Sequence, residues 1–220
     1  MSLAGAQRKL LVAYHDGMMY EPEGAAASTH ILKPNHPDKR ACPASVFNQY
    51  LTMRLARAAG LPAPNVHARY VPEPVYIVDR FDRVVAQLGD DPNGLPQVDV
   101  KRLHIIDACH LLNQSWVFKY NGALLEGLNE IIDKTINKLQ TRTRLFRWLV
   151  LNVLVANDDC HLKKLSFFMA ADGVRLTEHH DLLGTRAYYT KVVAQDKASW
   201  PDDVRKKLTG VRLFIDPAHQ

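Results

Sequence analysis

The sequence lacks the features of a disulfide-rich or membrane-spanning protein. It has only three cysteines among 220 residues, too far apart for a CxxC metal knuckle, so we expect no disulfides and a reducing compartment. The longest apolar stretch, residues 148–156, is interrupted by Asn152 and falls far short of the roughly 20 residues that a membrane helix needs. No apolar signal-peptide core follows the first methionine. We therefore expect a cytoplasmic protein that does not enter a membrane.

Long charge runs and low-complexity tracts are absent as well. Hydrophobic residues make up 47% and charged residues 23% of the chain, which is typical of a globular protein. The net charge of +5 is spread along the sequence, which disfavours direct nucleic-acid binding but is compatible with a small anionic ligand such as a nucleotide. A length of 220 residues predicts one domain or two closely packed lobes.

The first part of the chain, residues 1–84, has the turn signals and apolar runs of short antiparallel strands. One segment, residues 45–59, instead has apolar residues at helical spacing, with Ser45 as the expected N-cap and Gly60 as the stop. The sequence therefore predicts an N-terminal lobe with an antiparallel sheet and one helix. The expected strands cover residues 9–14, 18–20, 30–33, 66–70 and 75–78.

Residues 85–97 are rich in Gly, Asp and Pro and are predicted to link two lobes. Beyond them the apolar spacing becomes mainly helical, which predicts an α+β protein whose second lobe, residues 98–220, is mainly helical. The last expected helix is apolar nearly all round, so we expect it to be buried. The expected helices cover residues 98–112, 123–139 and 143–156, and a hairpin of residues 165–170 and 174–177 follows.

Two polar clusters flank this hairpin and can converge in space. Residues 157–164 follow the last expected helix, and residues 179–181 follow the second hairpin strand. Their carboxylates Asp159 and Asp181 suit metal-assisted phosphoryl transfer, in which one carboxylate orients the attacking hydroxyl and the other holds Mg²⁺. The alternative is a solvated loop that is merely rich in charge.

The histidines of the clusters allow a different interpretation. His161, His179 and His180 with Asp159 or Asp181 could bind Zn²⁺ or Fe²⁺, as in a metal-dependent hydrolase. Their spacing matches no HExxH pattern, and adjacent histidines on an extended segment would point in opposite directions.

The first lobe offers a candidate nucleotide clamp. Lys33 ends an expected strand, where a lysine can contact a phosphate, although an exposed strand-end lysine is the commoner outcome. Residues 77–83, just before the expected linker, would put backbone groups at the junction of the lobes, where an adenine could bind.

Taken in order, these segments resemble the HipA family of bacterial serine/threonine kinases, the toxin components of HipA–HipB modules. The resemblance covers almost the whole chain and implies a two-lobed, protein-kinase-like fold. It rests on the ordered set and not on any one segment. The matching segments are residues 2–7, 28–33, Ser45 and Val46 with Asn48 and Tyr50, 78–83, 159–163, Ser166 and Phe167, and Leu176 and Thr177 with residues 181–183.

The resemblance also implies roles for the matching positions. Asp159 would accept or orient the proton of the substrate hydroxyl, with His161 and Lys163 as the other catalytic candidates of its motif. Asp181, together with Asp159, would bind Mg²⁺. For ATP, the implied contacts are Lys33 and the backbone of Leu3, Ala4, Gly5, Ala6 and Gln7 with the phosphates, and Asp79 to Phe81 with the adenine; Ser2 holds the regulatory autophosphorylation position.

Two positions depart from the family pattern. Lys164 stands where the family has an Asn that helps to bind the metal, and an ammonium group repels Mg²⁺ instead of ligating it. Gln49 stands where relatives commonly carry Glu, so it can hydrogen-bond Lys33 but cannot form an ion pair. The family's N-terminal subdomain and last C-terminal helices also lack a counterpart, which implies either a fragment or a degenerate member.

The resemblance thus implies an ATP-dependent and Mg²⁺-dependent serine/threonine protein kinase, impaired or inactive as it stands. The alternatives are a pseudokinase, which binds nucleotide or protein without turnover, and the metal-dependent hydrolase. The implied partners are ATP, a protein substrate such as an aminoacyl-tRNA synthetase, and a HipB-like antitoxin.

Overall fold

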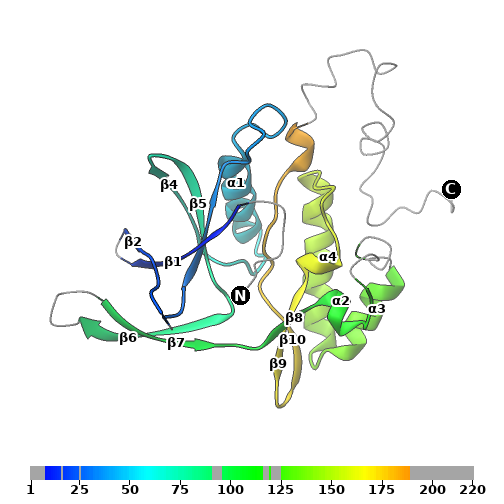
Figure 1. The fold of residues 1–220 in the computed structure, drawn as a ribbon. Coiled ribbons are helices and arrows are strands. Elements are labelled where there is room, and N and C mark those ends of the chain that lie inside the picture. The colour runs from blue at the N-terminus through cyan, green and yellow to red at the C-terminus, as the bar shows by residue number, and fades with distance from the viewer. Residues whose placement is uncertain are drawn as a thin grey trace, which may run out of the picture.

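The computed structural model describes residues 8–15, 17–24, 26–90, 96–115, 119 and 125–188 of the chain. Its N-terminal part is an antiparallel five-stranded sheet with the order β2-β1-β3-β5-β4 (Figure 1). This arrangement confirms the strands expected in this part of the sequence. The strands are β1 (Leu10–His15), β2 (Met18–Tyr20), β3 (His30–Pro34), β4 (Val66–Val71) and β5 (Glu73–Asp79).

Strand β5 lies inside this sheet, paired with β3 on one side and β4 on the other. Its apolar residues 75–78 are all buried. Helix α1 (Ser45–Ala58) packs against β4 and β5 and buries Val46, Met53 and Ala56. The sheet and this one helix share a core, which fixes the position of β3 and of the lysine near its end.

Helix α1 ends as predicted but begins differently. The Gly60 N–H bonds to the Arg57 carbonyl and the Leu61 N–H to the Ala56 carbonyl, a glycine stop with φ of 76°. Ser45 is the first helical residue and not the N-cap, since its Oγ accepts a hydrogen bond from the His36 N–H. The cap comes from the preceding loop, where Asn35 Oδ1 accepts the Val46 N–H at 3.1 Å.

Residues 83–90, 96–102 and 105–107 form strands where the sequence predicted a linker and a helix. Strand β6 (Arg83–Asp90) pairs with β7 (Pro96–Arg102), so the segment 85–97 includes parts of a two-stranded ribbon, and the lobe boundary there stays a prediction (Figure 1). The helix expected over 98–112 was wrong: β7 and β8 (Ile105–Asp107) occupy most of it, and only α2 (Ala108–Leu111) is helical. The alternation of Val98 and Val100 with polar residues is a period of two, which suits a strand.

The C-terminal part combines helices with a small sheet. Helix α3 (Leu125–Lys134) is separated from α4 (Lys138–Leu154) because Asn137 caps α4, accepting the Gln140 N–H. The single helix expected over 123–139 is therefore two elements. Strands β9 (Ser166–Ala170) and β10 (Gly173–Leu176) form the expected hairpin, and β8 pairs with β9 to complete a three-stranded sheet.

Helix α4 is buried on only one side, which corrects the expectation that it lies wholly within the core. Leu145, Trp148 and Leu151 are buried in the main core with Ile131 of α3. A second stripe remains exposed, since Phe146 is 65% and Leu154 77% accessible. No helix in the described part of the chain is both long and apolar enough to cross a bilayer.

Candidate active site

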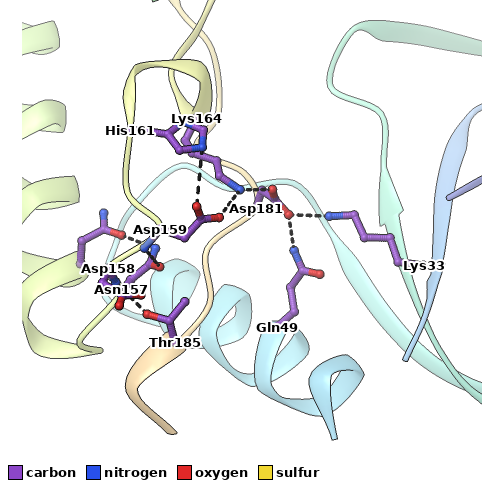
Figure 2. A network of polar contacts seen from close by, with 10 residues as sticks. Lys33, Gln49, Asn157, Asp158, Asp159, His161, Lys164, Asp181 and Thr185 are labelled. Atoms are coloured by element: carbon purple, nitrogen blue, oxygen red, sulfur yellow. Dashed lines mark hydrogen bonds and ion pairs between the residues drawn. The ribbon is translucent and has the colours of Figure 1, made fainter. Parts of the chain in front are cut away.

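Four segments that are distant in the sequence meet at Asp181. They are the end of β3, the first half of α1, the loop after α4 with the short helix η3 (Leu162–Lys164), and the extended segment after β10 (Figure 2). Lys33 Nζ lies 2.5 Å from Asp181 Oδ1, although the two residues are 148 positions apart. This contact brings the lysine that the sequence assigned to the phosphates and the aspartate that it assigned to the metal to the same place.

Lys33 is buried and not an ordinary surface lysine at a strand end. It pairs in register with Tyr76 of β5, and its Nζ lies 5.7 Å from the centre of the Tyr76 ring. Its side chain is 7% accessible. A buried ammonium needs a compensating anion, and Asp181 provides it.

The Asp181 carboxylate accepts three hydrogen bonds, from Lys33 and Gln49 at Oδ1 and from Lys164 at Oδ2. Gln49 Nε2 donates at 2.6 Å to Asp181, whereas the sequence had suggested Lys33 as its partner. Burial would raise the pKa of Asp181, but the charges of Lys33 and Lys164 hold it well below the usual value. The carboxylate is therefore ionised at neutral pH.

Asp181 also has an unusual backbone conformation. Its backbone angle φ is 58°, in the left-handed region that residues other than Gly, Asn and Asp seldom adopt. Such a conformation persists only where surrounding contacts enforce it, and it is common at functional sites. The three donors around the carboxylate are contacts of this kind.

Lys164 joins the two aspartates that the sequence singled out. Its Nζ contacts Asp181 Oδ2 and lies 3.2 Å from Asp159 Oδ2 (Figure 2). Burial alone would lower the pKa of Lys164, but Asp181 and Asp159 outweigh it and raise the pKa above the usual value. Lys164 is thus a protonated, positively charged group between the carboxylates.

The loop that carries Asp159 is held by Asn157, which belongs to the predicted polar cluster, and by Asn152 and Thr185, which sequence reasoning did not select as site residues. Asn157 Oδ1 accepts the Asp159 N–H at 3.2 Å, and the Asn157 amide donates to Asn152 of α4. Thr185 Oγ1 accepts the Asp158 N–H at 2.7 Å. Neither Asn152 nor Thr185 belongs to a motif, so only the fold shows that they position this loop.

A second clamp ties α1 to the segment beyond Asp181. The Asn48 side chain donates to the Gly184 carbonyl at 2.9 Å and accepts the Gly184 N–H at 2.8 Å. A side chain at position 184 would approach the Val155 carbonyl to 3.1 Å, so the close packing favours glycine. The two hydrogen bonds fix the segment 181–184 relative to α1 and therefore to Gln49.

The other candidates of the Asp159 motif have different surroundings. His161 Nε2 lies 3.7 Å from Asp159 Oδ1, and burial and the charge of Lys164 lower the pKa of His161 to about 4, so it is neutral at pH 7. Lys163 is near α2, where its charge partly opposes the rise in the pKa of Cys109 caused by burial. Cys160 is buried, and burial raises its pKa well above the usual value, which disfavours a nucleophilic thiolate.

The segment expected to contact adenine lies against the C-terminal part. The Phe81 ring centre is 4.9 Å from that of His180, which precedes Asp181. The Asp79 and Arg80 N–H groups already bond to the Asn65 and Thr29 carbonyls. The Asp79 carboxylate accepts from the Asn65 amide, so its observed contacts lie within the N-terminal lobe.

The remaining ATP candidates fall outside the described residues. They are Leu3, Ala4, Gly5, Ala6 and Gln7, and the regulatory position Ser2 lies outside the described residues as well. The described chain begins just after them, and Lys9 is already within the electrostatic range of the site. Burial lowers the pKa of Lys9, and the charges of Lys33 and Lys164 lower it further.

The residues around Asp159 and Asp181 do not fit a Mg²⁺ ion held between these two carboxylates. An ammonium group already contacts both of them, and it has no lone pair to offer a metal. The metal-dependent hydrolase is not supported either, because in the described part of the chain no three His, Cys, Asp or Glu side chains are grouped to hold a metal. His179 stacks on Trp148 while His180 contacts Phe81, so these histidines diverge.

The chain is similar to members of one protein family. The HipA-like C-terminal domain family matches residues 1–210. The serine/threonine-protein kinase toxin HipA of Shewanella oneidensis is 30% identical in an alignment 207 residues long that covers 86% of this chain and 44% of that protein. The putative kinase Y4mE of Sinorhizobium fredii is 33% identical in an alignment 193 residues long that covers 86% of this chain and 43% of that protein. The chain thus spans less than half the length of these curated relatives.

Solved structures show the same likeness. HipA of Shewanella oneidensis, in a complex with HipB and operator DNA, has a TM-score of 0.67 and 29% identity, covering 83% of this chain and 43% of that one. CtkA, a proinflammatory kinase of Helicobacter pylori, has a TM-score of 0.59 at 14% identity over 89% and 62% of the two chains, a likeness of fold alone. The fold is the two-lobed, kinase-like α+β fold, and the chain belongs to the family of HipA-like C-terminal domains.

Proposed function

We propose that this chain is the ATP-binding core of a HipA-type serine/threonine protein kinase, which transfers the γ-phosphate of ATP to a protein hydroxyl. The observation that carries the proposal is the contact between Lys33 and Asp181, which joins the sheet lobe to the helical lobe at 2.5 Å. Family membership supports it, because relatives over this region include the kinase toxin HipA. The setting that we propose is the cytoplasm.

In this proposal the two lobes bind ATP between them. Lys33 and the segment 3–7 contact the phosphates, and Phe81 with the backbone near Asp79 contacts the adenine. Lys33 and Lys164 supply positive charge at the phosphates, which is the main demand of phosphoryl transfer on a protein.

Asp159 is the residue that we propose to act on the substrate. The substrate hydroxyl oxygen attacks the γ-phosphorus while its proton passes to the Asp159 carboxylate, and the bond from that phosphorus to the β-γ bridging oxygen breaks to release ADP. At 41% exposure, the Asp159 side chain is accessible enough to meet a protein substrate. Ser2 is a candidate acceptor within the chain itself.

Calorimetric titration with ATP tests the binding. Lys33→Met should weaken ATP binding by about tenfold or more, because a buried phosphate-binding charge is lost. The matched control is Lys39→Met, since Lys39 is 64% exposed and pairs with Glu73 at the surface. Equal affinity in the wild type and Lys33→Met would remove Lys33 from the nucleotide site.

Transfer is tested with radiolabelled ATP. Asp159→Asn should leave ATP affinity nearly unchanged, because Asp159 does not hold the phosphates, but it should reduce transfer by roughly 10²-fold to 10⁴-fold. Equal transfer by the two proteins would contradict the role of Asp159.

A second candidate function, nucleotide binding without turnover, is favoured by one observation. Lys164 Nζ lies 3.2 Å from Asp159 Oδ2, so an ammonium group already occupies one carboxylate oxygen that would otherwise receive the proton of the substrate hydroxyl. A wild-type protein that binds ATP but transfers no phosphate to itself or to cell extract would select this pseudokinase function.

For partners, we propose a protein substrate such as an aminoacyl-tRNA synthetase and a HipB-like antitoxin. The support for the antitoxin is that the similar HipA of Shewanella oneidensis was solved with HipB and operator DNA. Co-purification with the product of a neighbouring helix-turn-helix gene tests this pairing, and its absence in a tagged co-expression would contradict it.

A further inference from the structure

The position between Asp159 and Asp181 resembles a divalent-cation site that a side chain has filled. The Asp159 carboxylate comes before the β9–β10 hairpin in the sequence and the Asp181 carboxylate comes after it. Both are directed at one point, as two carboxylates are when they share a metal ion. Here the point is occupied by Lys164 Nζ, which contacts Asp181 Oδ2 and lies 3.2 Å from Asp159 Oδ2 (Figure 2).

The acceptor capacity of Asp181 supports the same conclusion. A carboxylate has about four lone-pair directions, and three are used here by Lys33, Gln49 and Lys164. A metal at this point would have to displace Lys164, whose side chain is only 12% accessible. The displaced ammonium would then remain beside the metal as a repelling charge.

The charge around the site favours a highly charged anion. Lys33 and Lys164 contact the carboxylates directly, and Lys9 lies near enough to feel both ammonium groups. Lys9, Lys33 and Lys164 therefore bring positive charge to the surroundings of Asp181. Lysine binds phosphate as a mobile point charge, so these groups can neutralise a polyphosphate without a metal ion.

We propose that Lys164 takes the place of a divalent cation, so that this chain binds a metal-free nucleoside triphosphate instead of its Mg²⁺ complex. The inference rests on the proposed function for the nucleotide, but the replacement of the metal stands on the geometry alone. The resident ammonium makes divalent metal unnecessary for binding.

The first test measures the affinity of the wild type for ATP in EDTA and in excess MgCl₂ by calorimetry. We expect affinity in EDTA to equal or exceed that in Mg²⁺, because free ATP carries more negative charge toward the lysines. Binding that is at least about tenfold tighter with Mg²⁺ would overturn the inference.

The second test titrates Mn²⁺, detected by electron paramagnetic resonance, without nucleotide. Lys164→Asn should gain one Mn²⁺ site that is absent from the wild type, and the additional change Asp159→Asn should weaken that site. The control is Lys39→Asn, which removes the same charge from an exposed ion pair and should gain nothing. A folded Lys164→Asn protein without a new site, or a wild type with the same site, overturns the inference.

The two tests separate this inference from the proposed function. If the wild type binds ATP in neither buffer, both the proposed function and the proposed binding of metal-free ATP fail. The Mn²⁺ titration then still decides whether Lys164 fills a cation position. Should Lys164→Asn fail to fold by circular dichroism, Lys164→Gln serves as the second variant, and the wild-type ATP titrations need no variant at all.

Discussion

Asp82 and Asp181 each pair with two positively charged side chains, but the partners differ in how far away they lie in the sequence. Asp82 binds two neighbours on the same turn: Arg80 donates to both of its carboxylate oxygens at 3.0 and 2.7 Å, and Arg83 donates at 2.6 Å. Arg80 extends the cluster to Ser28 at 3.0 Å. The Arg80 and Arg83 side chains are 4% and 3% exposed, so this cluster is closed to solvent.

Asp181 obtains its partners from three distant elements instead. Lys33, Gln49 and Lys164 come from β3, α1 and η3, and no two of them are neighbours in the sequence. Its cations are lysines, whose flexible stems can follow a ligand, whereas the planar Arg80 guanidinium is held to Asp82 by two hydrogen bonds. The comparison agrees with the proposal that the Asp181 cluster binds the nucleotide, whereas the Asp82 cluster has the closed, local geometry of a structural ion pair.

The largest expected effect comes from a substitution in the Asp82 cluster. Asp82→Asn should lower the free energy of unfolding by about 3–5 kcal/mol, because it leaves two buried guanidinium groups without their anion. Urea denaturation measures the change. ATP affinity of the folded fraction should not change, since Asp82 lies outside the proposed phosphate contacts.

A matched surface variant controls for this experiment. Asp172 pairs with Arg175 across the turn between β9 and β10, and both side chains are exposed. Asp172→Asn should therefore have little effect on stability, since solvent screens such pairs. Equal effects of the two substitutions would show that burial does not distinguish the Asp82 cluster.

Asp181→Asn is the corresponding change on the binding side. It should lower the free energy of unfolding by about 1–3 kcal/mol, because Lys33 and Lys164 lose a charged acceptor. Asn tolerates the left-handed backbone at this position, so the loop conformation should survive. ATP affinity in EDTA should rise severalfold, since the carboxylate no longer competes with phosphate for the lysines. Calorimetry measures this affinity, and a fall would indicate that Asp181 holds the nucleotide through another cation.

Gln49→Glu sharpens the comparison by adding a charge at nearly constant shape. The new carboxylate would replace an amide that donates to Asp181 Oδ1 at 2.6 Å, so we expect a loss of about 1–2 kcal/mol at pH 7. The repulsion raises the pKa of the new acid in the folded protein. The destabilisation should therefore decrease as the pH falls and the acid is protonated. Denaturation at pH 7 and pH 5 checks the sign, and a variant as stable as wild type at pH 7 would mean that Lys33 moves to the new carboxylate.

The sequence was enough to select Lys33, Asp159 and Asp181 as site residues. It was not enough to predict the contacts that Lys164 and Gln49 make between them. Asp159 and Asp181 flank a hairpin with a clear turn, so their convergence could be predicted from local pattern, and Lys33 follows from the end of an apolar strand. Lys164 bridges Asp159 and Asp181 only because the fold brings both carboxylates close to its ammonium group, and the sequence pattern does not show this. Gln49 was assigned to Lys33 because charge alone cannot say which of two adjacent partners an amide will reach.

The same limit applies to the fold. The N-terminal sheet was predictable because its strands are short apolar runs with turn residues between them. Helix α4 was expected to be wholly buried because its apolar residues lie all round, yet the described chain leaves Phe146 and Leu154 exposed. Composition predicts that a face is apolar, whereas what packs on it is decided by the rest of the structure.

The smallest expected effect concerns His180, which lies beside Asp181 and under Phe81. Burial lowers the pKa of His180 to about 4 in the folded protein. On acidification from pH 7.5 to pH 6, His180 therefore becomes protonated in the unfolded chain but stays neutral in the folded one. Stability must then fall with falling pH, by about 1 kcal/mol or less from this residue at pH 6. His180→Phe keeps an aromatic ring against Phe81 but cannot be protonated, so thermal unfolding should depend less steeply on pH in this range. An unchanged slope in His180→Phe would show that His180 is protonated with equal ease in the folded and unfolded chains.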